Sequence, residues 1–204
     1  MNDSYFVNDE YWKEHVNKEL ESDMWIDEYK EYFNNKGKCL DLGCGIGQYS
    51  KILMEYGYNV TSADISEIAL KKVNEFNDNI MKIDMREKLS FPDNEFELVF
   101  ANLSIHYFND KDTKNLILEI KRVLKTDGLF IGSVNGIEGY QAIKSTAKEI
   151  EKHYWLNKGK YIRLFNEDDL KKYLSPFIIT MIEKRETIRF NHKKNYWIFI
   201  VRKR

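Results

Sequence analysis

The chain has 204 residues, of which 43% are hydrophobic and 32% charged, and its formal net charge is −1. This length fits one globular domain, and the composition is unlike that of a disordered chain. The balanced charge gives no general attraction to nucleic acid or to anionic membranes, so neither is an expected partner. No run reaches about 18 apolar residues, and Cys39 and Cys44 cannot support a disulfide framework. We expect a cytoplasmic protein, whose oligomeric state the sequence leaves open.

The first residues differ in pattern from those that follow. Residues 9–33 have the spacing of one or two amphipathic helices, so residues 1–37 are expected to form a helical cap. Beyond them, short apolar runs alternate with amphipathic stretches, which is typical of a parallel sheet covered by helices on both faces. The predicted core is residues 38–134, with strands at 38–42, 59–63, 80–83, 96–101 and 129–134 and helices at 48–56, 66–73 and 110–125.

After the core the alternation ends. Residues 140–155 have a mixed helical spacing, and 160–165 are expected to form an extended edge segment. Asn166 can cap a short helix that ends at residue 174. We interpret residues 135–175 as an insertion that acts as a lid.

Two apolar runs close the chain. Residues 178–185 and 196–201 have no helical pattern between them, so they are predicted to pair as an antiparallel hairpin within residues 176–204. The expected fold is a single α/β domain over residues 1–204.

A glycine-rich run, Leu40-Asp-Leu-Gly-Cys-Gly-Ile-Gly47, lies between the first predicted strand and the first core helix. Glycines at this junction let the backbone turn sharply and approach a ligand closely. A dinucleotide fingerprint requires a third glycine three residues after the second, where this chain has Gln48, and no Gly-Lys-Ser or Gly-Lys-Thr follows. The run therefore favours a ligand without phosphates, and a tight turn with no ligand is the alternative.

Acidic residues end the next two predicted strands. Asp64 follows the second strand, at the edge where ligands of open parallel sheets bind, and can accept hydrogen bonds from both hydroxyls of a ribose. Asp84 follows the third strand and can accept from an adenine amino group. The alternatives are a helix-capping acid and a surface loop acid. Together the two positions favour an unphosphorylated adenosine.

In these features the chain resembles the class I S-adenosylmethionine-dependent methyltransferases. The resemblance covers about residues 35–135 and includes the glycine run, Asp64, Asp84 with Met85, and the strand at 96–101. It implies a Rossmann-like, doubly wound, seven-stranded sheet that is mostly parallel with an antiparallel C-terminal strand. It also implies S-adenosylmethionine as the cofactor. A looser similarity to tellurite-resistance methyltransferases rests on Arg163 and Phe165.

The resemblance also implies roles for single residues. Gly43, Gly45 and Gly47 border the methionine part of the cofactor, Asp64 holds the ribose, and Asp84 with the amide of Met85 reads the adenine. Asp41 helps to orient the ammonium group, with a structural buried acid as the alternative. The other residues expected at the cofactor are Cys44, Ile65, Ala101 and Asn102.

The methyl acceptor is expected beyond the fourth strand, at residues 102–108. His106 can remove a proton from an acceptor near neutral pH, and Tyr107 is a second candidate. A packed, hydrogen-bonded histidine and a core tyrosine are the alternatives. Asn102 is not followed by the Pro-Pro pair typical of enzymes that methylate base amines, and the His and Cys residues form no metal-ligand cluster.

Aromatic residues flank the predicted core on both sides and could form a lid, with core packing as the alternative. They are Tyr5, Phe6, Tyr11 and Trp12 before the core, and Tyr140, Tyr154, Trp155, Tyr161 and Phe165, with Arg163, after it. The sequence thus predicts a metal-independent methyltransferase that acts on a small molecule by direct in-line transfer. A protein or RNA methyltransferase, a non-catalytic binding module and a dinucleotide oxidoreductase stay open.

Overall fold

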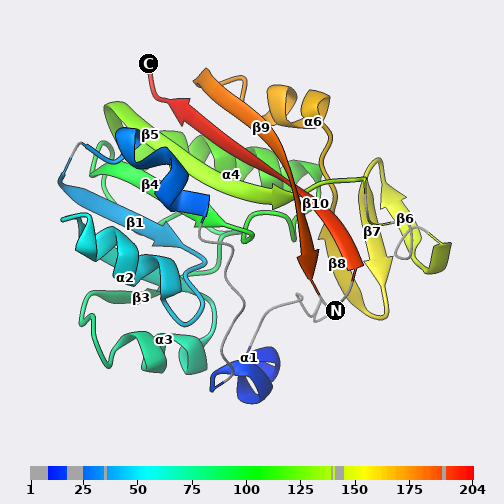
Figure 1. Cartoon of the computed structure of the whole chain (residues 1–204), viewed down its shortest axis with the longest axis horizontal. Coiled ribbons are helices and arrows are strands. Elements are labelled where there is room, and N and C mark those ends of the chain that lie inside the picture. The colour runs from blue at the N-terminus through cyan, green and yellow to red at the C-terminus, as the bar shows by residue number, and fades with distance from the viewer. Residues whose placement is uncertain (1–8, 18–24, 35, 139, 141–144, 190–191) are drawn as a thin grey trace.

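The computed structural model describes residues 9–17, 25–34, 36–138, 140, 145–189 and 192–204. Its centre is a seven-stranded sheet in the order β3-β2-β1-β4-β5-β10-β9 (Figure 1). The strands are β1 (Lys38–Leu42), β2 (Asn59–Asp64), β3 (Ile80–Lys82), β4 (Phe96–Asn102), β5 (Leu124–Asn135), β9 (Ile178–Arg189) and β10 (His192–Arg202).

The first five strands of this sheet are parallel, and β10 pairs antiparallel with both β5 and β9. Strand β10, the last strand of the chain, thus lies between β5 and β9, and β5 comes much earlier in the sequence. The predicted seven-stranded Rossmann-like sheet and its antiparallel C-terminal strand are confirmed. The hairpin strands are longer than the two apolar runs predicted from sequence.

Helices cover both faces of the sheet. They are a 3-10 helix η1 (Trp25–Tyr32), α2 (Gln48–Glu55), α3 (Glu67–Val73), α4 (Asp110–Val123) and α6 (Glu167–Tyr173), whereas α1 (Asp9–His15) packs against α3. Helices α2, α3 and α4 alternate with the strands along the chain as predicted. The side chains of Ser66 and Asn109 cap the N-termini of α3 and α4.

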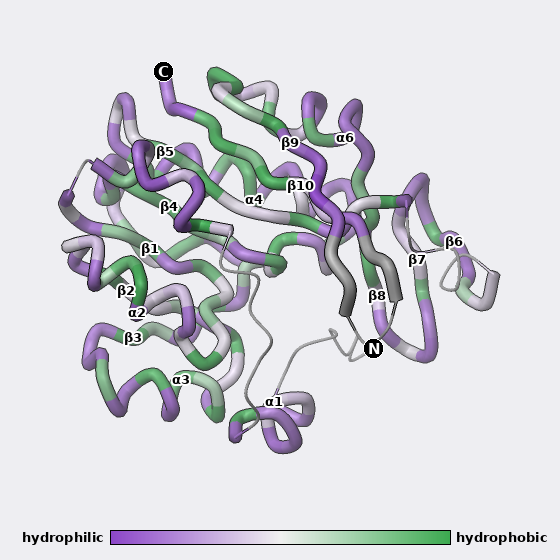
Figure 2. Tube along the Cα trace, viewed as in Figure 1, coloured by the Kyte–Doolittle hydropathy of each residue, from purple (hydrophilic) through white to green (hydrophobic). Residues whose placement is uncertain are grey.

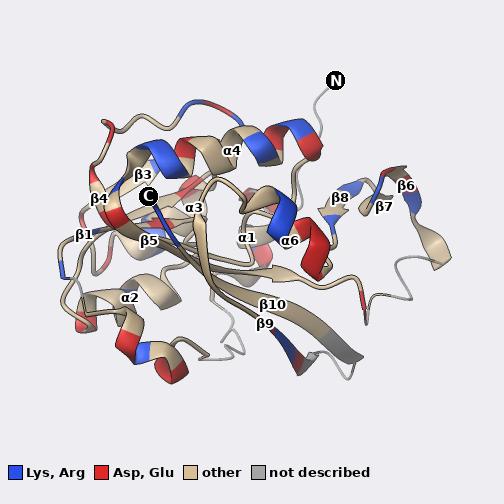
Figure 3. Cartoon of the chain, turned by 90° about the horizontal axis from the view of Figure 1, so that it is seen from above, with Lys and Arg blue, Asp and Glu red and all other residues tan. Residues whose placement is uncertain are grey.

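Strand β4 shows how the core is divided, because its side chains alternate between the faces. Val99 packs in the cluster that contains α4 and α6, whereas Leu98 and Phe100 pack in the cluster that contains η1 and α2. Hydrophobic residues follow β10 through the interior in Figure 2, and Figure 3 shows charged residues mainly on helices and loops. Two apolar layers therefore pack on the two faces of the central sheet.

One predicted element is wrong. Residues 140–155 were expected to be helical; residues 141–144 lie outside the described residues, but β6 (Lys148–Glu151) and β7 (Tyr154–Asn157) occupy the range from residue 148 on. Strand β7 pairs with both β6 and β8 (Lys160–Arg163) in a small antiparallel sheet. The turn between β6 and β7 contains His153 with a φ of 61°, which ends any helical path. Backbone pairing between these strands outweighs the weak helical spacing of the side chains.

Candidate active site

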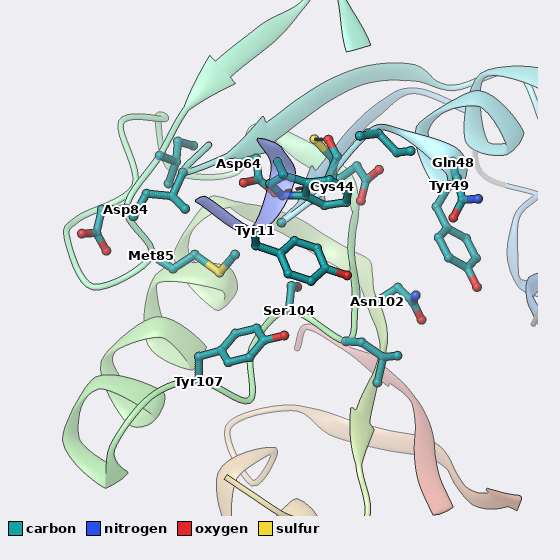
Figure 4. A pocket seen from close by; sticks show the side chains of 18 of the residues that line it. Tyr11, Cys44, Gln48, Tyr49, Asp64, Asp84, Met85, Asn102, Ser104 and Tyr107 are labelled. Carbon is teal, nitrogen blue, oxygen red and sulfur yellow. Dashed lines mark hydrogen bonds between the residues drawn. The ribbon is translucent and has the colours of Figure 1, made fainter. Parts of the chain in front are cut away.

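A cavity opens at the carboxyl ends of β1, β2 and β4, where ligands of open parallel sheets bind (Figure 4). It is lined by Tyr11, Trp12, Asp41, Gly43, Cys44, Gly45, Ile46, Gln48, Tyr49, Asp64, Ile65, Ile83, Asp84, Met85, Asn102, Leu103, Ser104, Tyr107 and Phe108. Most residues expected at the site are brought together here. Gly47, Ala101 and His106 are not among the lining residues.

The glycine loop is shaped for close contact. Gly43 and Gly45 have φ values of 78° and 54°, in the left-handed region that favours glycine. A Cβ on Gly43 would overlap the Cβ of Ser104, and one on Gly45 would lie 2.7 Å from Cζ2 of Trp12. The N–H of Gly43 donates to the carbonyl of Ala63 at 2.7 Å. There is therefore no room for a side chain at Gly43 or Gly45, and a ligand there would meet their backbone.

Gly47 has a different place from the other two glycines. It is the N-cap residue of α2, has a φ of 78°, and stands against Phe76 and Val73. Ala101 is fully buried within β4. These two residues support the cavity from behind its surface.

Asp64 joins the glycine loop to the end of β2. Its carboxylate accepts the N–H of Gly45 at 2.8 Å and the N–H of Ser66 at 2.9 Å. Burial raises the pKa of Asp64, and these backbone hydrogen bonds oppose that effect. Because each carboxylate oxygen can accept more than one hydrogen bond, Asp64 keeps capacity for hydroxyl groups of a ligand.

Asp41 lies deeper in the cavity. It is 2% exposed and accepts the hydroxyl of Ser50 at 2.6 Å, and Ser50 in turn accepts from Ser62 at 2.8 Å. Burial raises the pKa of Asp41 to about 7, although the hydrogen bond from Ser50 works in the other direction. A cationic ligand group nearby would favour the ionised form of Asp41.

Asp84 lies at the margin of the cavity and is paired within its own loop. The side chain of Arg86 donates from Nε to both oxygens of Asp84, at 2.9 and 3.0 Å, and a second guanidinium nitrogen also contacts the carboxylate. Burial by itself would raise the pKa of Asp84, but hydrogen bonds from Arg86 outweigh it and lower that pKa. A contact to adenine would have to share Asp84 with Arg86.

Cys44 also lines the cavity, and burial raises the pKa of its thiol well above the ordinary range, which keeps it protonated.

The loop after β4 forms the opposite wall. Asn102 accepts hydrogen bonds from the indole of Trp25 at 3.1 Å and from Ser133 at 2.6 Å, which fixes its amide oxygen. The hydroxyl of Ser104 donates to the carbonyl of Leu42 at 2.6 Å. In Figure 4 the phenol rings of Tyr107 and Tyr11 both project into the cavity below the glycine loop. This wall was predicted only as a region, and Ser104, Leu103 and Phe108 were not singled out in it.

His106 lies behind this wall. It is 2% exposed, its Nε2 is 3.1 Å from the amide nitrogen of Asn135, and its Nδ1 has no partner. Burial lowers the pKa of His106 to about 3, so the imidazole is neutral at physiological pH. The amide of Asn135 also accepts the phenol of Tyr140 at 2.6 Å. His106 is therefore placed to hold the loop after β4 rather than to touch a ligand.

The small sheet holds the same loop through Arg163. Its backbone N–H donates to the carbonyl of His106 at 2.7 Å, and its Nε donates to the carbonyl of Phe108 at 3.0 Å. The guanidinium is buried, pairs with Glu151 at 3.0 Å and lies over the ring of Tyr154. The segment proposed as a lid after the core thus lies behind the acceptor loop.

Of the two aromatic groups expected to form a lid, only part of the first reaches the cavity. Tyr11 and Trp12 of α1 line it, and no aromatic residue described after residue 108 does. Tyr5 and Phe6 lie outside the described residues. The sequence offered Tyr11 and Trp12 as part of a lid but did not predict where α1 docks, because the docking depends on a contact of Asp9 with the start of α3.

Several known proteins are similar to this chain. Residues 40–132 match the family described as methyltransferase domain. The human protein named arginine-hydroxylase NDUFAF5, mitochondrial, is 34% identical over 129 residues, which cover 62% of this chain and 35% of that protein. The chain thus matches about a third of that relative's length.

Two solved structures establish the fold by their similarity. An S-adenosylmethionine-dependent methyltransferase from Methanosarcina mazei has a TM-score of 0.76 at 22% identity, covering 87% of this chain and 96% of its own. TehB from Haemophilus influenzae has a TM-score of 0.69 at 18% identity, covering 96% of this chain and 67% of its own. Within the described ranges, no helix is long and apolar enough to cross a membrane, and no three His, Cys, Asp or Glu residues are grouped to hold a metal ion.

Proposed function

We propose, from the premise that this chain is a class I S-adenosylmethionine-dependent methyltransferase, that it methylates a small molecule by direct in-line transfer. The observation that carries the proposal is the two-sided cavity. One side is the glycine loop with Asp41 and Asp64, and the other is an aromatic wall that includes Tyr11 and Tyr107. A concave, mostly apolar site with a few convergent polar groups suits a small ligand.

The cofactor end has groups that fit S-adenosylmethionine. The glycine loop leaves room only for backbone contact with the methionine part, and Asp41 can attract the ammonium group. Asp64 can accept the ribose hydroxyls beside its two backbone partners. Ile65 and Met85 are proposed to pack around the adenine, with the N–H of Met85 as its hydrogen-bond donor.

The bound cofactor supplies a methyl group already activated on a sulfonium, so the chain mainly has to position the acceptor and exclude water. Burial raises the pKa of Tyr107, which keeps its phenol protonated near neutral pH. We propose that Tyr107 orients the acceptor by hydrogen bonding rather than by taking its proton. His106 is proposed to act as a positioning residue through its contacts with Asn135 and Arg163.

The acceptor class can be tested with methyl-labelled cofactor and a cell extract divided into small-molecule, protein and RNA fractions. We expect label in the small-molecule fraction, and less label at limiting cofactor concentration when Asp64→Ala replaces the wild type. Label retained in protein or RNA would contradict the proposal. Cofactor binding without transfer to any fraction would also contradict it and favour a non-catalytic binding module.

We also propose a cytoplasmic location, which is supported by the two unpaired thiols of Cys39 and Cys44. The human relative is named as mitochondrial, so that compartment is the alternative. Fluorescent tagging of the full-length protein in its own cell distinguishes the two.

A further inference from the structure

Helix α1 is fixed to the cofactor end of the cavity by Asp9. The carboxylate of Asp9 accepts the hydroxyl of Ser66 at 2.6 Å and the N–H of Ile68 at 3.2 Å. The hydrogen bond from Ser66 is the main reason that the pKa of Asp9 is lowered. Ser66 also donates its N–H to Asp64. The helix is therefore attached to the same turn that holds the proposed ribose-binding acid.

This attachment places Trp12 over the glycine loop. The indole is 6% exposed and lines the cavity, and its Cζ2 would lie 2.7 Å from a Cβ on Gly45. Cζ2 and Nε1 are both bonded to Cε2, which would lie 3.8 Å from that Cβ. Cη2 lies closer, at 3.0 Å, so the benzene edge of the indole packs against Gly45, and Nε1 lies no closer to that Cβ than Cε2 does.

The indole N–H of Trp12 is buried and has no hydrogen-bond partner. A buried indole N–H usually has one, because leaving the donor unpaired costs free energy. Asp41 and Asp64 also line the cavity, but neither accepts a hydrogen bond from this N–H. An unpaired donor on a ring that lines the cavity beside the glycine loop is therefore a candidate site for an acceptor group on a ligand.

We propose that Trp12 is a cofactor-binding residue, whose indole N–H donates to the α-carboxylate of S-adenosylmethionine while its ring covers the methionine part. The carboxylate is the only anionic group of that cofactor. Asp41 and Asp64 repel an anion, so a neutral N–H donor is the group that can receive it at this end. Asp9 is the positioning residue that holds Trp12 in place. The inference rests on S-adenosylmethionine being the cofactor.

The test uses two ligands that differ only in the carboxylate, S-adenosylmethionine and its decarboxylated form, titrated calorimetrically into the full chain. Binding of S-adenosylmethionine to the wild type tests the cofactor itself. For Trp12→Phe we expect about tenfold weaker binding of S-adenosylmethionine, the size of a hydrogen bond to a charged group. Binding of the decarboxylated form should change by less than about twofold, because no partner for the N–H is lost.

The matched control is Trp155→Phe. Trp155 also has a buried indole N–H without a partner, but it lies in β7 and does not line the cavity. Its substitution should leave both affinities unchanged. An equal loss for the two ligands with Trp12→Phe, or no loss for either, would overturn the proposal.

Folding and function are separated by the unliganded proteins. Trp12→Phe removes an unpaired donor, which favours the folded state, and part of a buried ring, which disfavours it, so the variant should still melt cooperatively without ligand. Asp9→Ala should weaken S-adenosylmethionine binding several-fold, and adding Trp12→Phe should weaken it by less than the product of the two single effects. Independent effects of the two substitutions would show that Asp9 does not position Trp12.

Discussion

The two ends of the cavity are held by different kinds of contact. At the cofactor end, Asp41 bonds to Ser50 and Asp64 bonds to Gly45, partners that lie 9 and 19 residues away along the chain. At the acceptor end, the loop after β4 is held by Arg163, which lies 55 residues beyond Phe108. The first end is a compact unit of strand, loop and helix. The second is assembled from distant segments and meets the first where Ser104 donates to the carbonyl of Leu42.

The largest effect should come from Gly43→Ala. Its left-handed φ and the overlap with Ser104 should lower the free energy of unfolding by about 3 kcal/mol or more and abolish cofactor binding. The control is Gly159→Ala. Gly159 has a φ of 76°, but a Cβ there would have no atom within 4 Å, so the free energy of unfolding should fall by about 1 kcal/mol. Urea unfolding measures both. Equal costs would show that the close packing of the loop is unimportant.

Asp64→Ala should weaken binding of S-adenosylhomocysteine by about 1–3 kcal/mol, because ribose hydroxyls and two backbone N–H groups lose their acceptor. Asp84→Ala should weaken the same binding by less than about 1 kcal/mol, since that carboxylate is partly exposed and already paired with Arg86. Calorimetric titration compares the two. A larger loss for Asp84 would reverse the assignment of the main cofactor acid.

Arg163→Lys tests whether the acceptor end is independent of the cofactor end. Lysine cannot reproduce the contacts of the buried guanidinium with Phe108 and Glu151, so the free energy of unfolding should fall by about 1–2 kcal/mol. Affinity for S-adenosylhomocysteine should stay within about twofold. Arg202→Lys, at an exposed position, is the control for stability. A parallel loss of cofactor affinity would mean that the two ends are coupled.

The two ends should also respond oppositely to pH. Burial raises the pKa of Asp41 to about 7 from 3.8, so the folded state binds more protons than the unfolded state in that interval and loses stability as pH rises. Burial lowers the pKa of His106 to about 3 from 6.5, so the folded state binds fewer protons and gains stability as pH rises.

These opposed contributions predict a weak pH dependence in the wild type between about pH 4.5 and 6.5. Asp41→Asn should leave stability rising with pH, and His106→Asn should leave it falling, each by at most about 1.4 kcal/mol per pH unit. Urea unfolding across this range measures the slopes. Slopes of the same sign in the two variants would contradict the buried, opposed titrations.

Local patterns predicted the cofactor end because its parts are close in sequence. Alternating apolar runs specify the parallel strands, and the glycines between β1 and α2 mark the loop. The pairing of Asp84 with Arg86 is also local, two residues apart, and could have been anticipated.

Long-range contacts explain what the sequence did not predict. Residues 148–157 form the paired strands β6 and β7, β7 also pairs with β8, and the long-range contact is that of Arg163 in β8 with the acceptor loop. Trp12 lies over Gly45 because Asp9 binds Ser66, which is 57 residues away. The position of His106 behind the cavity wall follows from Asn135 and Arg163, and its neighbours in sequence give no sign of it.

The most direct test of the account is calorimetric titration of the wild-type chain with S-adenosylhomocysteine and, separately, with a nicotinamide dinucleotide. The glycine loop followed by Gln48, with Asp64 at its side, predicts saturable binding of S-adenosylhomocysteine and none of the dinucleotide. Binding of the dinucleotide alone would contradict the assignment of the cavity to S-adenosylmethionine.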